Sequence, residues 1–287
     1  MTVVEAGPGP DTSGVAALTG NGLQLPIGGG SPVVTRFETV LTDRPARTMS
    51  LVRGATVGGS GAVNGGYFCR ALPSDLDEWG LDGWAWSDLL PHFRAVETDL
   101  DFPDAPAHGG RGPIRVRRAN EILGTTAHLV ESAARAGYPW LDDLNDGSSA
   151  ALPTGIGLVP SNIVDGVRAG SGAAFLVPAT ARRNLAVLPG TRAVQVVFDG
   201  LRATGVRVFG PAGPQVLTAD RIVLCAGAIG SAHLLMLSGI GDEQMLRRAG
   251  VPFHDDEREV QSRLYGDVEE RFGGLEDLRA NAAGPWA

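Results

Sequence analysis

The sequence predicts an α/β fold with additional α+β elements, and three stretches support this prediction. The chain opens with a short apolar strand that ends in Glu5. A glycine-dense stretch follows at 53–66, and an apolar strand, a tight turn and an apolar helix follow at 221–241. Apolar strands that alternate with helices are typical of a parallel sheet whose faces the helices cover.

The glycine-dense stretch has six glycines in fourteen residues. Because glycine has no side chain, the backbone amides stay uncovered and the chain can approach a bulky ligand closely. The step Gly58-Gly59-Ser60 allows successive N–H groups to converge on an anion, and a helix that begins near Ser60 would point its positive end at the same anion. A flexible loop is the alternative interpretation of this stretch taken alone.

The opening strand and the 221–241 unit fit the same ligand class. In dinucleotide-binding folds, an acidic residue at the end of the second parallel strand binds the adenosine ribose hydroxyls, and Glu5 has this position. A lone glutamate at a strand end is otherwise usually solvated. In the later unit, residues 222–225 form an apolar segment that we expect to be a strand, and Gly227 and Ala228 form the turn before an apolar helix.

Taken together and in this order, these stretches resemble the glucose–methanol–choline (GMC) family of flavin-dependent oxidoreductases. Residues 53–64 resemble the first family signature and residues 227–241 the second. The resemblance implies a Rossmann-like, FAD- or NAD(P)-binding parallel sheet with an incomplete antiparallel substrate domain near 70–165. Within the family, the sequence is most similar to members associated with mycofactocin. Connecting segments that also resemble the family are 73–79, 86–93 and 108–114.

The resemblance also implies a cofactor, a reaction and a set of binding residues. FAD would accept a hydride from the CH–OH group of a small-molecule alcohol, and a redox partner or another electron acceptor would then reoxidise it. Glu5 would bind the ribose, Asn64 would lie beside the flavin ring, and the backbone of Val194 would contact adenine. The remaining residues assigned to the cofactor are Arg53, Gly54, Val57, Gly58, Gly59, Ser60, Gly227 and Ala228.

No catalytic residue is assigned, because no histidine lies in the family's catalytic context. The histidines considered are His92, His108, His128, His233 and His254. His108 lies in a loop rich in Pro, Gly and Asp, and a lone histidine in such a loop is expected to be exposed and without a function. His233 is expected to pack on an apolar helix face.

The resemblance extends from about residue 2 to residue 253. The family's first strand, with its Gly-x-Gly-x-x-Gly loop, and its catalytic C-terminal third have no counterpart, so we expect a fragment of a longer enzyme whose sheet lacks its first strand. Residues 254–287 contain nine acidic residues and four arginines and are expected to form a divergent tail, disordered or weakly helical. The alternative function is a catalytically inactive fragment or an interaction module that keeps part of the flavin-binding fold.

Composition excludes several other classes. The formal charge of −8 disfavours nucleic-acid binding. All 24 basic residues are arginines, which excludes a P-loop lysine and a Schiff-base lysine on this chain. The two cysteines, Cys69 and Cys225, have no metal-binding spacing and are expected to be free thiols, with a single disulfide between them as the alternative. With no apolar run of 18 residues and no signal-peptide pattern, the sequence predicts no membrane span and a cytoplasmic protein. Because no group of residues has zinc-ligand spacing, no metal is predicted.

Local patterns predict the remaining elements. The first half should contain a hairpin at 33–50 with its turn at Arg44-Pro45, and helices at 62–68, 87–99 and 122–136, the last ending at Gly137. A strand at 155–164 should belong to the second sheet, and a helix should begin in 168–176. The second half should contain strands at 185–188 and 193–198, a hairpin of 202–209 with 215–218, and a helix at 242–249.

Overall fold

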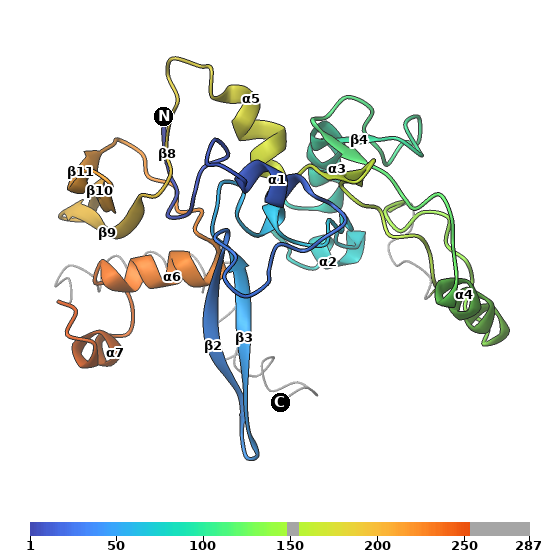
Figure 1. Cartoon of the computed structure of the whole chain (residues 1–287), viewed down its shortest axis with the longest axis horizontal. Helices are drawn as coiled ribbons and strands as arrows, with labels where there is room; N and C mark the ends of the chain where they lie inside the picture. The colour runs from blue at the N-terminus through green and yellow to red at the C-terminus, as the bar shows by residue number, and fades with distance from the viewer. Residues whose placement is uncertain (148–154, 253–287) are drawn as a thin grey trace. The chain divides into compact units, whose positions relative to one another are not determined.

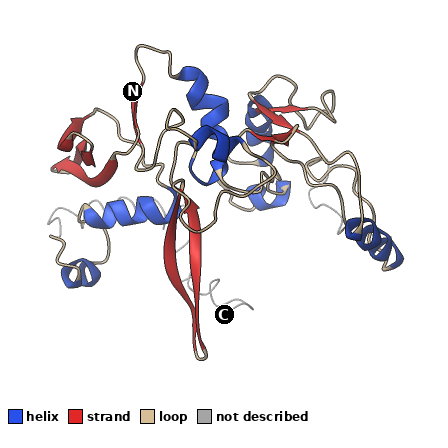
Figure 2. Cartoon of the chain, viewed as in Figure 1, coloured by secondary structure: helices blue, strands red, loops and turns tan. Residues whose placement is uncertain are grey.

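The computed structural model describes residues 1–147 and 155–252 (Figure 1). The predicted tail at 254–287 lies outside the described residues. The chain divides into two compact units. Unit 1 comprises Met1–Val3 and Gly7–Val187, and unit 2 comprises Val4–Ala6 and Leu188–Ala287. The mixture of helices and short strands agrees with the α/β and α+β prediction (Figure 2).

In unit 1 the most extended element is an antiparallel ribbon of β2 (Val34–Asp43) and β3 (Ala46–Gly54) (Figure 2). The ribbon turns at the cis peptide bond Arg44–Pro45. This confirms the predicted hairpin and its turn, although β3 runs four residues further than expected. Because β3 ends at Gly54, the ribbon leads directly into the glycine-dense stretch.

The core of unit 1 lies beside this junction. Helix α1 (Val15–Gly20) contributes Val15, which packs with Val33, Ala62 and Val63. The glycine-dense stretch continues as a single 3₁₀ turn, η1 (Gly59–Ala62), so the helix predicted for 62–68 is wrong. The helix cannot continue because the Asn64 side chain accepts a hydrogen bond from the Gly66 N–H, and Gly66 has a positive φ of 74°.

A second part of unit 1 contains α2 (Pro73–Asp77), α3 (Trp86–Val96) and a parallel pair of β4 (Glu97–Asp99) with β5 (Ile114–Val116). The predicted helix 87–99 is therefore wrong at its end, where the chain becomes a strand. The helix ends here because the backbone at Glu97 packs directly on the backbone at Gly112. Only glycine allows this contact, since a Cβ at Gly112 would lie 2.2 Å from the Glu97 nitrogen. Helix α4 (Thr125–Arg135) ends before Gly137 as predicted, but it begins three residues later than expected.

Only the last two residues of the strand predicted for 155–164 form one, β6 (Ile163–Val164), which pairs with β7 (Val167–Arg168). The helical turn predicted after Arg168 is present as η2 (Gly172–Leu176) and α5 (Val177–Ala179). Strand β1 (Thr2–Val4), at the predicted opening strand, pairs with β8 (Ala186–Leu188).

Unit 2 contains the predicted antiparallel meander. Strand β10 (Arg202–Gly210) lies between β9 (Arg192–Asp199) and β11 (Gly213–Thr218). Helix α6 (Gly227–Leu237) packs on β9, and Ser238 connects the two because its Oγ accepts a hydrogen bond from the Val196 N–H at 2.7 Å. Helix α7 (Glu243–Arg248) begins after Asp242, whose side chain caps its first turn.

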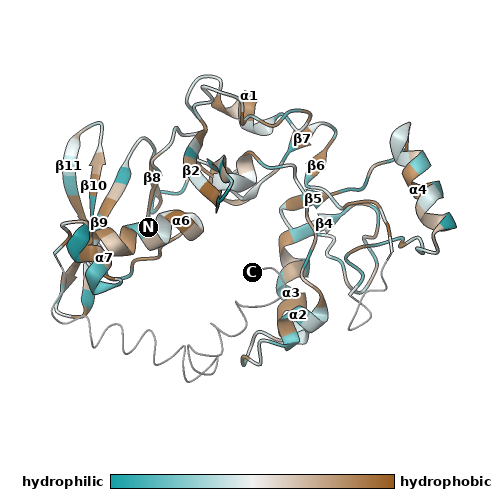
Figure 3. Cartoon of the chain, turned by 90° about the horizontal axis from the view of Figure 1, so that it is seen from below, coloured by the Kyte–Doolittle hydropathy of each residue, from teal (hydrophilic) through white to brown (hydrophobic). Residues whose placement is uncertain are grey.

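The strand predicted for 222–225 is absent from unit 2. These residues are apolar, and the side chain of Val223 is 80% exposed. A strand requires the backbone of a neighbouring segment, and none of the described residues pairs with this one. The following helix α6 is apolar around its circumference, with brown residues along it in Figure 3, yet Leu234 is its one fully buried residue.

Each unit contains one cysteine. Cys69 belongs to unit 1 and Cys225 to unit 2. Both are free thiols, as predicted, and both are exposed. Among the described residues, no helix combines the length and apolar character that crossing a membrane requires.

Candidate functional site

Seven of the predicted cofactor residues lie together in unit 1. They are Arg53, Gly54, Val57, Gly58, Gly59, Ser60 and Asn64. The chain leaves β3 at Gly54 and folds back in a glycine turn, residues 54–60, the last two of which begin η1. The Gly54 N–H donates to Ser60 Oγ at 3.0 Å, and the Gly59 N–H donates to the Thr56 carbonyl at 2.8 Å. These bonds close the glycine turn on itself.

The glycines of this turn differ in what surrounds them. A Cβ at Gly54 would lie 2.2 Å from the Gly59 oxygen, and one at Gly58 would lie 3.1 Å from the Gly172 nitrogen. These two glycines therefore allow the backbone to pack on itself. Gly59 has a φ of 55°, and no heavy atom lies within 4 Å of the place where its Cβ would be. Its outer side is open for an incoming ligand.

Asn64 is exposed, but its conformation is fixed from three directions. Its N–H donates to the Ser60 carbonyl at 3.0 Å, and its Oδ1 accepts from the Gly66 N–H at 2.9 Å. Its own carbonyl accepts from Arg168 Nε at 2.9 Å. Because Oδ1 is engaged, the amide plane is fixed, and Nδ2 makes no hydrogen bond to any described residue. Asn64 thus presents an oriented donor.

Arg53 and Val57 are less defined as binding groups. The Arg53 side chain is exposed, and its Nη1 donates to the Val52 carbonyl at 2.8 Å. Val57 is half-buried in the glycine turn. Both residues remain predictions as cofactor contacts.

The other four predicted residues belong to unit 2. The Glu5 N–H donates to the Leu188 carbonyl at 3.1 Å, and the Glu5 carbonyl accepts from Thr191 at 2.9 Å. Val194 lies at a register shift of β9, since Gln195 pairs with Arg207 and Ala193 pairs with Val208. Val194 is therefore the extra residue of a β-bulge, and such residues leave the ladder.

Gly227 begins α6 with a φ of 77°, and no heavy atom lies within 4 Å of its missing Cβ. Ala228 follows it and is exposed. Two of the predicted residues have the open surroundings that a dinucleotide requires. Gly59 and Gly227 both have open sides where a bulky ligand could approach the backbone, and a Cβ would fill both places.

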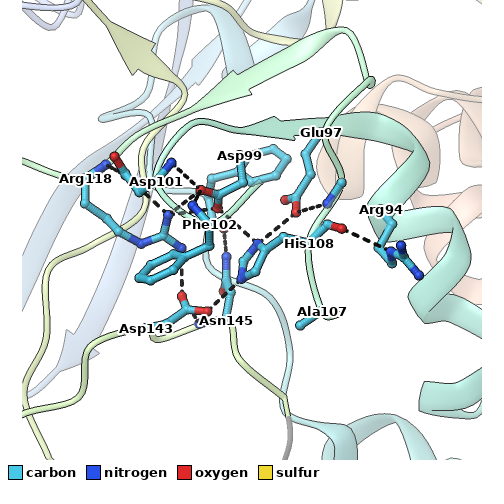
Figure 4. Close-up of polar contacts among 12 residues, drawn as sticks. Arg94, Glu97, Asp99, Asp101, Phe102, Ala107, His108, Arg118, Asp143 and Asn145 are labelled. Carbon is cyan, nitrogen blue, oxygen red and sulfur yellow. Dashed lines mark hydrogen bonds and ion pairs between the residues drawn. The ribbon is translucent and has the colours of Figure 1, made fainter. Parts of the chain in front are cut away.

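A second, unexpected polar group lies in unit 1. This buried ion-pair network consists of Arg70, Glu97, Asp99, His108, Arg118 and Asp143. Figure 4 shows Glu97, Asp99, Arg118 and Asp143 around His108. Its centre is His108, which is 2% exposed, so the expectation that this histidine is exposed is wrong. The loop that carries His108 packs closely on the end of α3, and only a glycine fits at position 109, because a Cβ there would lie 1.8 Å from the Arg94 oxygen. The glycine therefore allows a backbone contact that buries the neighbouring imidazole.

His108 contacts three carboxylates. Its Nδ1 lies 3.0 Å from Glu97 Oε1 and 3.0 Å from Asp99 Oδ2, and its Nε2 lies 2.6 Å from Asp143 Oδ2. Burial by itself lowers the pKa of His108, but the hydrogen bonds to Asp143, Asp99 and Glu97 outweigh burial and raise the pKa to about 10. The ring is therefore an imidazolium at neutral pH, and both of its N–H groups donate.

Two guanidinium groups complete the network. Arg70 Nη2 donates to Glu97 Oε1 at 2.6 Å, and Arg118 donates to both Asp99 oxygens at 2.8 and 2.9 Å. Arg118 also donates to Asp143 at 2.7 Å and lies over the Phe102 ring. The three cations thus neutralise the three buried acids, which burial requires.

Glu97, Asp99 and His108 also have ligand atoms within 4.8 Å of one another, close enough to hold a metal ion. We assign no metal to them. A cation would have to displace the proton of His108 Nδ1, and it would then lie beside the two guanidinium groups that already pair with these acids. We therefore interpret the group as a structural network.

The sequence prediction missed this network because it extended a helix to residue 99. On a helix, Glu97 and Asp99 point in different directions. On a strand, residues two apart share a face, so β4 directs both carboxylates to His108. The Glu-x-Asp spacing before a glycine-rich loop is the signal that could have revealed it.

The comparisons with known proteins agree with this architecture. A family model described as GMC oxidoreductase matches residues 15–257. An uncharacterized GMC-type oxidoreductase from Rhodococcus erythropolis is 36% identical over 236 residues, which are 82% of this chain and 46% of that protein. An oxygen-dependent choline dehydrogenase from Pectobacterium carotovorum is 34% identical over 230 residues, which are 78% of this chain and 40% of that protein.

Solved structures are similar as well. Pyridoxine 4-oxidase from Mesorbium loti is 31% identical with a TM-score of 0.77, over 88% of this chain and 49% of that one. An FAD-dependent oxidoreductase from Chaetomium thermophilum is 26% identical with a TM-score of 0.73, over 88% of this chain and 45% of that one. The chain thus spans less than half the length of these relatives, and the Rossmann-like FAD-binding fold predicted for it is that of its structural neighbours. The chain belongs to the GMC oxidoreductase family.

Proposed function

We propose that this chain binds FAD and takes part in the oxidation of the CH–OH group of a small-molecule alcohol. The observation that carries the proposal is the glycine turn 54–60, where Gly59 leaves the backbone open in a chain of the GMC family. FAD, which the comparison with C. thermophilum oxidoreductase names, supplies the hydride acceptor of this chemistry.

The residues of the chain would bind and orient the cofactor. The backbone N–H groups of the glycine turn other than those of Gly54, Ala55 and Gly59, which are already hydrogen-bonded, would donate to phosphate oxygens, because successive backbone amides form an anion-binding concavity. Asn64 Nδ2 would donate to a flavin carbonyl, and Glu5 would accept from the ribose hydroxyls. The backbone of Val194, at the bulge of β9, and the open sides of Gly227 and Ala228 would receive the adenosine part. No base is assigned among these residues.

The donor and the acceptor are proposed from the relatives. The names choline dehydrogenase and pyridoxine 4-oxidase make choline and pyridoxine suitable first donors to test. We propose a mycofactocin-type redox partner as acceptor, with oxygen as the alternative that the name of the Pectobacterium relative suggests. The reaction would take place in the cytoplasm.

Titration of the full chain with FAD tests the binding step. Quenching of flavin fluorescence that saturates at one FAD per chain would support the proposal, and an unchanged fluorescence spectrum at micromolar FAD would reject it. Reduction of a redox dye with choline or pyridoxine, measured with and without added FAD, then tests turnover.

The second candidate is a non-catalytic interaction module. The segment 222–225 favours it, because Val223 is 80% exposed and none of the described residues pairs with the backbone of this apolar segment, which can therefore pair with another chain. Binding of FAD without any dye reduction by an alcohol panel would favour this candidate over the enzyme.

A further inference from the structure

Arg168, at the end of β7, is buried with 3% exposure and forms no ion pair with an acid in the part of the chain that the structure describes. Its guanidinium instead donates to four backbone carbonyls, from two separate parts of unit 1. Nε donates to Asn64 at 2.9 Å. The other bonds go to Thr19 at 2.9 Å, Asn21 at 2.8 Å and Gln24 at 2.9 Å.

This environment differs from that of the other buried arginines. Arg70 and Arg118 each pair with buried carboxylates. None of the ion pairs among the described residues includes Arg168, and burial lowers its pKa from the usual value. An arginine nevertheless keeps its proton in a protein. Among the described residues, the positive charge of Arg168 therefore has no acidic partner, and the backbone carbonyls that it contacts, including that of Asn64, stabilise it.

The bond to Asn64 has a geometric consequence. The Asn64 carbonyl is fixed by Arg168 while its Oδ1 is held by the Gly66 N–H. The same guanidinium holds the 19–24 segment, where the Leu23 N–H donates to Asn21 Oδ1 at 2.9 Å. One side chain thus sets the position of the exposed amide donor of Asn64 relative to its surroundings.

We propose that Arg168 is a positioning residue for FAD: it fixes Asn64 in the orientation that presents Nδ2 to the flavin, and its charge favours the anionic cofactor. This inference rests on the proposed function. The inference goes beyond the proposed function because it assigns a role to a residue outside the predicted site. None of the four hydrogen bonds of the Arg168 side chain involves the glycine turn 54–60.

The test compares Arg168→Lys and Arg168→Gln with the wild-type full chain. Lysine keeps the charge but loses the planar fork that reaches four carbonyls, whereas glutamine also loses the charge. We expect the lysine variant to bind FAD about tenfold more weakly, as the loss of about one well-formed hydrogen bond implies. The glutamine variant should bind more weakly still, and the difference should shrink at high salt.

Amide hydrogen exchange of the chain without FAD provides a second, independent readout. In Arg168→Lys, the Gly66 and Leu23 amides should exchange faster, because both donate to side chains of residues that Arg168 fixes. Arg36→Lys is the matched control, since the exposed Arg36 donates to the carbonyls of Ile27 and Gly28 and has no bond to Asn64. It should leave both readouts unchanged.

Unchanged exchange at Gly66 in a folded Arg168→Lys chain would overturn the proposal, and so would an equal loss of affinity in Arg36→Lys. A lysine variant that does not fold would also overturn it, because the role would then be structural alone. If the wild-type chain does not bind FAD, the proposed function fails, and exchange at Gly66 alone decides whether Arg168 positions Asn64.

Discussion

His108 Nε2 and Asp143 Oδ2 lie 2.6 Å apart, although 35 residues separate them in the sequence. This bond ties the glycine-rich loop after β4 to the segment that follows α4. Asp143 Oδ1 in turn accepts from Arg118 at 2.7 Å and from the Asn145 N–H at 3.0 Å. The imidazolium therefore joins β4, the loop that carries His108 and the segment that follows α4.

We expect His108→Gln to destabilise the chain by about 3–5 kcal/mol, the usual effect of removing one partner from a buried ion pair. Urea unfolding followed by circular dichroism measures the change. His128→Gln is the matched control, because His128 is exposed on α4 and should change the free energy of unfolding by less than about 0.5 kcal/mol. Equal effects of the two substitutions would contradict the central role of His108.

Stability should depend on pH in a way that the network dictates. The pKa of His108 is raised from 6.5 to about 10, so its contribution is complete below pH 6.5 and is lost as the pH rises through about 10. Hydrogen bonds from His108 and Arg118 outweigh burial and lower the pKa values of Asp99 and Asp143 from 3.8, so their contribution is lost as the pH falls below that value.

The unfolding midpoint in urea should therefore be highest between about pH 4 and 6.5, the ordinary pKa values of these groups. The sequence has no lysine, so lysine titration cannot cause the alkaline decline. His108→Gln should flatten that decline while keeping the acid one. An alkaline decline of the same size in this variant would show that other groups cause it.

Gly59→Ala should affect FAD binding more than stability. A Cβ has room there, so the cost to the fold is the strain of a positive φ, about 1–2 kcal/mol. The added methyl group would occupy the open side of the glycine turn, and we expect FAD affinity to fall at least tenfold. Gly30→Ala has the same kind of strain at a φ of 77° with open space around it, and it should leave affinity unchanged in a fluorescence titration.

Asn64→Asp separates the two parts of the Asn64 side chain. Aspartate keeps an acceptor for the Gly66 N–H but lacks the Nδ2 donor, so the melting temperature should stay close to that of the wild type. FAD affinity should fall about tenfold or more, because a donor becomes an acceptor. Asn64→Ala should lower stability as well, by about 1 kcal/mol. A wild-type FAD affinity in Asn64→Asp would remove Asn64 from the binding site.

Valines 223 and 208 should respond differently to the same change. Val223→Ser should change the free energy of unfolding by less than about 0.5 kcal/mol, because Val223 is 80% exposed. Val208→Ser should cost about 2 kcal/mol or more, because Val208 is 2% exposed in β10. A large cost at Val223 would show that the segment 222–225 is packed in solution.

The sequence predicted best what local patterns control. The ribbon around Arg44–Pro45, the end of α4 at Gly137 and the meander β9–β11 follow from turn residues and apolar alternation. The glycine-dense stretch was also predicted to bring the backbone into close approach, and a Cβ at Gly54 or Gly58 would indeed meet neighbouring backbone.

Predictions failed where distant segments decide the conformation. Residues 222–225 have the composition of a strand, but a strand forms only against a partner. From the sequence, Glu97 and Asp99 were predicted to end a helix. In the structure they form a strand, because β5 pairs with them and the glycines after His108 pack against their backbone. The role of Arg168 was not predicted from the sequence. Its hydrogen-bond partners are backbone carbonyls, which every residue has, so no residue type indicates them.

The placement of the two cysteines makes the chain suitable for dual labelling. Cys69 and Cys225 are both exposed, and each belongs to a different unit. Burial raises the pKa of Cys69, so near neutral pH its thiolate is scarcer and a maleimide dye should attach to it more slowly than to an ordinary thiol. A donor and an acceptor fluorophore on these thiols would therefore report, by energy transfer, how the spacing of the units responds when FAD is added.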